Sequence, residues 1–169
     1  MPRCWVRCAP ALDGPRVCLT ARVRASPRYV SVTHFTELRA WQLANRLRIE
    51  IFRFTSVAPA VHDRRFCDDV RASGASVCSN LSEGFGRYVH GEFAHFVTIA
   101  RGSLTETQDH LLDANSRQYL ESEKFEELWA LSTEAMGAVT GLLRYLKSHA
   151  TPAGAWADPP SSRAKIRSK

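Results

Sequence analysis

Apolar residues recur every three or four positions in four long segments between residues 33 and 150, and this period decides what the chain can fold into. Such spacing places the apolar residues along one face of an α-helix, whereas a strand needs alternation at every second residue. No β-type alternation of useful length occurs in the sequence. The pattern therefore predicts an all-α protein, and its longest stripe consists of Phe93, Phe96, Val97, Ala100, Leu104, Thr107, Leu111 and Ala114.

Turn and capping residues separate the four segments and leave short connections between them. Thr36 is placed to cap a first helix that ends at the turn around Pro59, and a second helix is expected to begin after Asp63. Ser122 is placed to cap the fourth helix. Amphipathic helices joined by short connections pack against their sequence neighbours, so we expect an up-down-up-down four-helix bundle over residues 33–150.

The second helix has an inner face and an unusual run of small residues. The run includes Gly74, which costs about 1 kcal/mol relative to Ala in a helix interior, so a close approach by another helix is expected there. The inner face is predicted to consist of Phe66, Val70, Ser73, Val77 and Leu81. Other apolar residues exceed one face per helix, which predicts burial on a second side and hence a homo-oligomer: Leu43, Ile49, Phe52, Trp129, Met136 and Leu143.

Positive charge is concentrated at the two ends of the chain. The net charge is +6, of which residues 1–32 contribute +5 and residues 148–169 contribute +3, leaving −2 for residues 33–147. Residues 1–32 are expected to be a disordered basic extension and residues 151–169 a disordered basic tail. Basic tails attract RNA or DNA, although solvated ends without a partner have the same composition. The C-terminal basic residues expected to bind nucleic acid are Arg163, Lys165, Arg167 and Lys169.

Several functional classes find no support in the sequence. No apolar run is long enough to cross a bilayer, and the beginning of the chain is no secretion signal, so we expect a cytoplasmic protein without a membrane partner. Hydrolase, nucleotide-binding and dinucleotide-binding motifs are not found. A dinuclear metal site needs two Glu-x-x-His motifs, and only Glu92–His95 has that spacing. We therefore expect no enzyme activity, cofactor or metal, and we expect Cys67 and Cys78 to be small apolar residues.

A cluster of polar residues follows the small residues of the second helix. Asn80, Glu83 and Arg87 are spaced by three and four residues and so share one helix face. An interior pair between Glu83 and Arg101 is expected as a device that fixes the register between helices, while a recognition surface is the alternative. Arg87 lies at a helix end and is the residue of this cluster expected to contact nucleic acid. The same motifs also contain Gly84, Gly86, Gly102 and Glu106.

These residues resemble the motifs of a known family. Residues 76–87 read S-V-C-S-N-L-S-E-G-F-G-R, similar to the family pattern S-I-P-A-N-I-A-E-G-F-G-R, and residues 100–106 are similar to its A-R-G-S-x-x-E run. Upstream, Leu38 and Trp41-Gln42 are similar to its L-x-x-W-Q opening. Over about residues 34–147 the chain therefore resembles the four-helix-bundle family of the 23S rRNA intervening-sequence proteins, whose relatives include the accessory variability determinant proteins of diversity-generating retroelements.

The resemblance implies a ring-shaped homopentamer without catalytic activity. In the retroelement branch it implies a basic scaffold that binds nucleic acid and a reverse transcriptase. The chain departs from the pattern where Cys78 replaces a Pro, so no kink is expected there, and where Asp69, beside Asp68, replaces a Gln, which disfavours contact with phosphate. A nucleic-acid-associated scaffold, a protein-interaction scaffold without nucleic acid and, with least support, an enzyme remain as interpretations.

Overall fold

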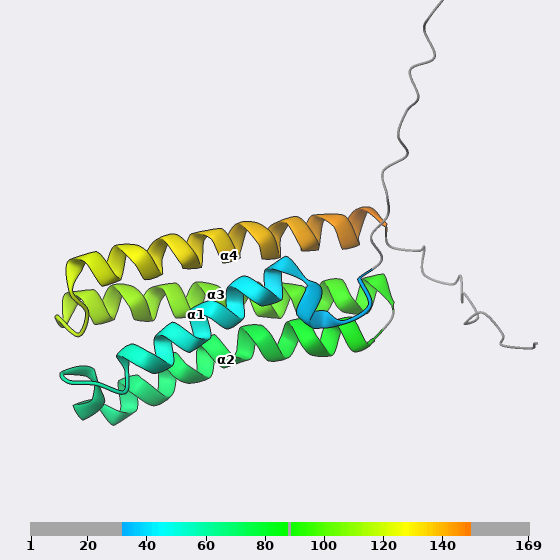
Figure 1. Ribbon diagram of the computed structural model, residues 1–169. Helices are drawn as coiled ribbons and strands as arrows, with labels where there is room; N and C mark the ends of the chain where they lie inside the picture. Colours follow the sequence, from blue (N-terminus) through cyan, green and yellow to red (C-terminus); the bar gives the residue numbers. More distant parts are fainter. Residues whose placement is uncertain (1–31, 88, 150–169) are drawn as a thin grey trace, which may run out of the picture. The chain divides into compact units, whose positions relative to one another are not determined.

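Four α-helices make up most of the part of the chain that the computed structural model describes, residues 32–87 and 89–149 (Figure 1). Two short 3-10 helices accompany them, and these residues form no strand, which confirms the all-α prediction. The elements are η1 (Phe35–Glu37), α1 (Arg39–Phe54), η2 (Ala60–His62), α2 (Arg64–Gly86), α3 (His90–Ser116) and α4 (Ser122–Ser148).

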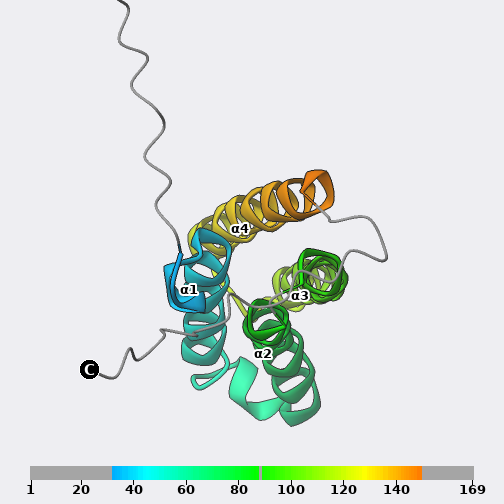
Figure 2. The same cartoon turned by 90° about the vertical axis from the view of Figure 1, so that its right-hand side faces the viewer.

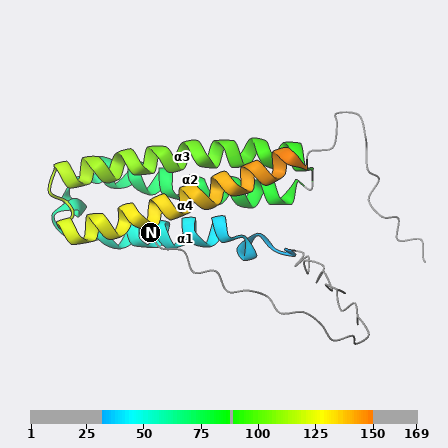
Figure 3. The same ribbon diagram turned by 90° about the horizontal axis from the view of Figure 1, so that it is seen from above.

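The helices are arranged as an antiparallel bundle in sequence order. Seen end-on, they occupy four corners, with α1 beside α2, α2 beside α3, α3 beside α4, and α4 closing against α1 (Figure 2). The view from above shows the four axes running along a common direction (Figure 3). This is the predicted up-down-up-down bundle, and it puts the α1–α2 pair and the α3–α4 pair on opposite sides.

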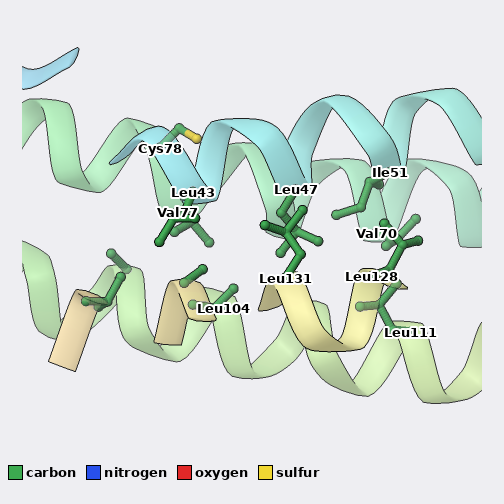
Figure 4. Close-up of a cluster of buried hydrophobic side chains, with 14 of the residues drawn as sticks. Leu43, Leu47, Ile51, Val70, Val77, Cys78, Leu104, Leu111, Leu128 and Leu131 are labelled. Carbon is green, nitrogen blue, oxygen red and sulfur yellow. The ribbon is translucent and has the colours of Figure 1, made fainter. Parts of the chain in front are cut away.

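Side chains from all four helices fill the interior between these corners (Figure 4). Every residue predicted for the inner face of α2 is buried, and so is the predicted stripe of α3 apart from the half-buried Phe93 and Phe96. On α4 one expectation is wrong, because Leu143, predicted to lie outside the single inner face, is buried in the core, while its neighbour Leu142 is half-buried. The largest fully buried apolar side chains are Leu47, Ile51, Val70, Val77, Leu81, Val97, Leu104, Leu111, Leu128 and Val139.

Asp63 joins the start of α2 to the connection between α3 and α4. Its Oδ1 accepts a hydrogen bond from the Phe66 amide at 3.0 Å, which caps α2, and α2 begins after Asp63 as the sequence predicts. Its Oδ2 accepts bonds from Arg117 Nη1 and from Tyr119 Oη, each at 3.0 Å. The hydrogen bond from the Phe66 amide, together with the hydrogen bonds from Tyr119 and Arg117, holds the pKa of the Asp63 carboxyl below its usual range.

Two predicted helix caps are wrong. α1 begins at Arg39 rather than at Glu37, because residues Phe35–Glu37 form a separate 3-10 turn and the backbone of Leu38 after it is extended. The Glu37 carboxylate also accepts bonds from the amide and hydroxyl of Thr33 at 3.0 and 2.9 Å. Thr36 lies inside that turn, which His34 caps. At α4 the cap position is occupied by Glu121, and Ser122 is the first helical residue.

Candidate interaction surfaces

The buried edge of the 76–87 motif lies at the seam between α2 and α3. Ser76 and Ser103 share a hydrogen bond of 2.9 Å between their hydroxyls, and Asn80 Nδ2 donates to the Ser76 carbonyl at 2.8 Å. Near the end of α2, a Cβ added to Gly84 would lie 2.5 Å from Phe93 Cδ2 and 2.8 Å from Phe96 Cβ. Gly84 therefore has a structural role, since it lets the two helices approach each other closely, whereas the Asn80 side chain binds back to its own helix.

The exposed edge of the same motif carries Glu83 and Arg87. Arg87 Nη2 donates to Glu83 Oε1 at 2.7 Å, and the two side chains are 48% and 52% exposed. The Arg87 guanidinium also lies over the Phe96 ring, 5.2 Å from its centroid. The predicted interior pair between Glu83 and Arg101 is wrong, because Glu83 binds the residue one turn along its own helix instead.

Arg101 and Glu106 do not join this edge as one site. Both are exposed on α3, and neither takes part in an ion pair among the residues that the structure describes. Five residues separate them, which places them about 140° apart around the helix axis. Gly102 and Gly86 have nothing within 4 Å of an added Cβ, so the protomer itself gives no packing reason for either glycine. The predicted motif residues thus divide into a buried seam and separate exposed positions.

The one Glu-x-x-His motif does not contribute to a metal site within the described part of the bundle. Glu92 and His95 are both exposed, as the helical period predicts. Within residues 32–87 and 89–149 no group of three His, Cys, Asp or Glu side chains is placed to hold a metal ion. Cys67 and Cys78 are buried and unpaired as predicted, and burial raises the pKa of the Cys78 thiol to about 11, so it is protonated at neutral pH.

A groove between α1 and α2 carries the most exposed large hydrophobic side chain of the described residues. This side chain is Phe52, which is 60% exposed, and Ile49, one turn before it, is 42% exposed. The groove is completed by Ala75 of α2 and by three arginines, Arg48, Arg53 and Arg71. The prediction of apolar residues beyond the core is thus confirmed for Ile49 and Phe52, whereas Leu43 and Leu143 belong to the core and Trp129 and Met136 are half-buried.

Arg71, which no sequence motif indicates, organises this groove. Its guanidinium lies over the Phe52 ring, 4.8 Å from the centroid. Its Nε donates to Thr55 Oγ1 at 2.7 Å, and its Nη2 donates to the Thr55 carbonyl at 3.0 Å and to Ser56 Oγ at 3.3 Å. These bonds fix the guanidinium where the end of α1 leaves carbonyl groups without a helical partner. An arginine facing a neighbouring helix end is too common a pattern to identify such a contact from sequence.

The bundle has a basic half and an acidic half. α1 holds four Arg against one Glu and α2 holds three Arg against three acidic residues, which gives this pair +3. α3 holds one Arg against four acidic residues and α4 holds three basic against four acidic residues, which gives that pair −4. Summed over residues 33–147 these charges nearly cancel, so the net charge of the segment conceals their separation.

Some predicted features lie outside the described residues. They are the boundaries of the two basic tails and the four C-terminal residues Arg163, Lys165, Arg167 and Lys169. No helix among the residues that are described is both long and apolar enough to span a membrane.

The fold defines the class of this protein: it is an antiparallel four-helix bundle in which the motif of residues 76–87 packs α2 on α3. A crystal structure of a protein with unknown function from the S23 ribosomal protein family of Bacteroides thetaiotaomicron has a similar fold, with a TM-score of 0.58, 17% identity, and coverage of 62% of this chain and 95% of that chain. Among curated proteins, none matches this sequence. The chain belongs to the 23S rRNA-intervening sequence protein family, whose sequence pattern matches residues 36–141. This confirms the resemblance to that family, while the relation to the retroelement proteins stays a prediction.

Proposed function

We propose that the protein is a non-enzymatic homo-oligomeric scaffold that associates with RNA or DNA through its basic terminal segments. The observation that carries this proposal is the distribution of charge, since the segments before residue 33 and after residue 147 contribute +8 while residues 33–147 contribute −2. Phosphate binding needs Lys and Arg in excess over acidic groups, and this excess is larger at the two ends of the chain, +8, than on the α1–α2 pair, +3.

The topology of the bundle supports a shared nucleic-acid-binding end. An even number of antiparallel helices returns the chain to the end where it started, so the beginning of α1 and the end of α4 lie at the same end of the bundle (Figure 1). The α2–α3 connection, which contains the exposed Arg87, lies at that end as well. The described chain therefore enters α1 and leaves α4 at the end of the bundle that holds Arg87.

Oligomerisation raises the strength of such binding. The family resemblance implies a homopentamer, in which five copies of each basic segment act on one nucleic acid. Several tethered weak contacts bind more tightly than one because each raises the effective concentration of the next. Light scattering tests the assembly directly: five times the 18.9 kDa protomer mass is 94.5 kDa. A mass of one protomer at micromolar concentration would contradict the oligomer.

A salt titration against structured RNA tests the nucleic-acid part of the proposal. The test variant is the full chain with Arg163, Lys165, Arg167 and Lys169 all replaced by Gln. The matched control carries the same charge change on the bundle, with the exposed residues Arg46, Arg64, Arg144 and Lys147 replaced by Gln. We expect only the tail variant to bind more weakly and with a shallower salt slope, by about 0.9 for each duplex phosphate that the variant no longer neutralises.

Two outcomes of this titration contradict the nucleic-acid role. Equal weakening in both variants would place the binding on the bundle instead of the tail. No binding by the unmodified chain at low salt would favour the alternative, a protein-interaction scaffold without nucleic acid. For the retroelement branch the proposed protein partner is a reverse transcriptase, and co-purification of the two proteins is the test for that partner.

A further inference from the structure

We infer that the α1–α2 groove is a self-association surface, which binds the acidic α3–α4 face of a second copy of this chain. The inference rests on the proposed oligomer and assigns it a location. The groove is the surface formed by Ile49, Phe52, Ala75, Arg48, Arg53 and Arg71.

The groove has the composition of the centre of a protein interface. Ile49 and Phe52 are one helical turn apart and present an apolar strip to the solvent, with Ala75 beside them on α2. Arginine and aromatic side chains are enriched in the parts of interfaces that contribute most to binding. Arg71 is held in place by its bonds to Thr55 and Ser56, so less side-chain entropy is lost when a partner binds.

The opposite side of the bundle has the complementary features. Leu112 is 46% exposed and lies one turn beyond Gln108, whose Nε2 donates to Ser132 Oγ of α4 at 3.1 Å, so Leu112 faces the α3–α4 edge. Trp129, three residues before Ser132, is half-buried on the α4 side of that edge and stacks on Phe125 with the ring centroids 5.8 Å apart. This face therefore also presents an aliphatic and an aromatic side chain.

Carboxylates border this second apolar pair. Asp109 lies three residues before Leu112, and Glu126 lies three residues before Trp129. Both are exposed, and neither forms an ion pair with another of the described residues. A head-to-tail contact brings these carboxylates to the groove arginines, Arg48 and Arg53, and pairs the −4 half of one copy with the +3 half of the next. Such a heterologous contact repeats from copy to copy and forms a ring when its rotation closes.

A nucleic acid fits the groove less well than a second copy does. The lining between the arginines is aliphatic and aromatic carbon, and Arg71 already covers one face of the Phe52 ring, where a base would stack. A protein surface with an apolar centre and carboxylates around it complements both the apolar lining and the arginines of the groove.

Charge reversal with rescue by mixing tests the contact in the full-length chain. The groove variant is Arg48→Glu with Arg53→Glu, and the face variant is Asp109→Lys with Glu126→Lys. The control, Arg64→Glu with Arg144→Glu, carries the same charge change as the groove variant on other exposed positions. Masses are measured by light scattering over a range of concentrations, and circular dichroism checks that each variant keeps its helices.

We expect the groove and face variants each to assemble at least about tenfold more weakly than the unmodified chain, because like charges then oppose each other across the contact. The control should assemble normally. Mixing the groove and face variants should restore assembly, since each then offers a surface of opposite charge to the other. A second pair of substitutions, Ile49→Ser with Phe52→Ser, should weaken assembly without changing any charge.

The outcomes separate this inference from the proposed function. If the unmodified chain is a monomer, the proposed oligomer fails and the inference fails with it. If the unmodified chain assembles and the groove variant assembles as well as the control, the oligomer stands and the groove assignment is wrong. If the mixture does not assemble, the groove does not meet the α3–α4 face. If the variant with Ile49→Ser and Phe52→Ser assembles normally but loses RNA binding, the inference is wrong and the groove is a nucleic-acid surface.

Discussion

Gly84 offers the sharpest test of the seam between α2 and α3. A Cβ at this position would lie 2.5 Å from Phe93 Cδ2 and 2.8 Å from Phe96 Cβ, whereas a Cβ at Gly102 or Gly137 meets nothing within 4 Å. The Phe93 ring can turn away, but Phe96 Cβ is attached directly to the α3 backbone. Gly84→Ala therefore forces the two helices apart, and overpacking of this kind costs about 1–3 kcal/mol.

The comparison with Gly102→Ala isolates that cost. Replacing Gly by Ala inside a helix stabilises it by about 1 kcal/mol, and this gain is common to both variants to a first approximation. We therefore expect Gly102→Ala and Gly137→Ala to raise the free energy of unfolding, and Gly84→Ala to lie about 1–3 kcal/mol below them. Urea denaturation followed by circular dichroism measures the free energy of unfolding of all three variants. If the slope of this free energy against urea concentration is unchanged, the midpoints can be compared directly. Three variants within about 0.5 kcal/mol of one another would refute the close approach.

Three further substitutions test other parts of the structure. Thr107→Val removes a fully buried hydroxyl that donates to the Ser103 carbonyl at 2.8 Å and lies 3.0 Å from Ser73 Oγ, and it should lower the free energy of unfolding by about 1–2 kcal/mol in urea. Glu83→Ala should leave the melting temperature unchanged in calorimetry, because the ion pair between Glu83 and Arg87 is exposed. A large decrease in the melting temperature would instead support an interior pair between Glu83 and Arg101. The hydrogen bond from Lys124 holds the pKa of Glu50 below 4.5, so the unfolded state binds the proton more tightly and stability should fall as the pH drops below about 4.5. Glu50→Gln should show a smaller loss over the same acid titration.

Periodicity in the sequence is sufficient to predict the helices and their packing order. The stripe from Phe93 to Ala114 spans almost the whole of α3, and Asp63 is predictable as the start of α2 because an acidic residue before an apolar repeat is a frequent cap. Short connections then leave one simple arrangement for four amphipathic helices. These features depend on residues close together in the sequence, where the physical rules are strongest.

Contacts between residues far apart could not be predicted in the same way. The sequence favours a pair between Glu83 and Arg101, which lie in the two neighbouring motifs, but Arg87, four positions after Glu83, is its partner in the structure. The contact of Arg71 with Phe52 and Thr55 depends on how α1 and α2 are rotated about their axes, which periodicity constrains only loosely. The division of charge between the two helix pairs emerges only when the packing order and the sums over each helix are considered together.

The order of the helices also bears on how the chain folds during synthesis. α1, α2 and α3 leave the ribosome before α4, and each of them can pack on its predecessor as it appears. Until residues 122–148 follow, the sides of α1 and α3 that α4 later covers remain in water. The nascent three-helix intermediate is thus open along one edge, and premature termination before α4 leaves a product prone to aggregation.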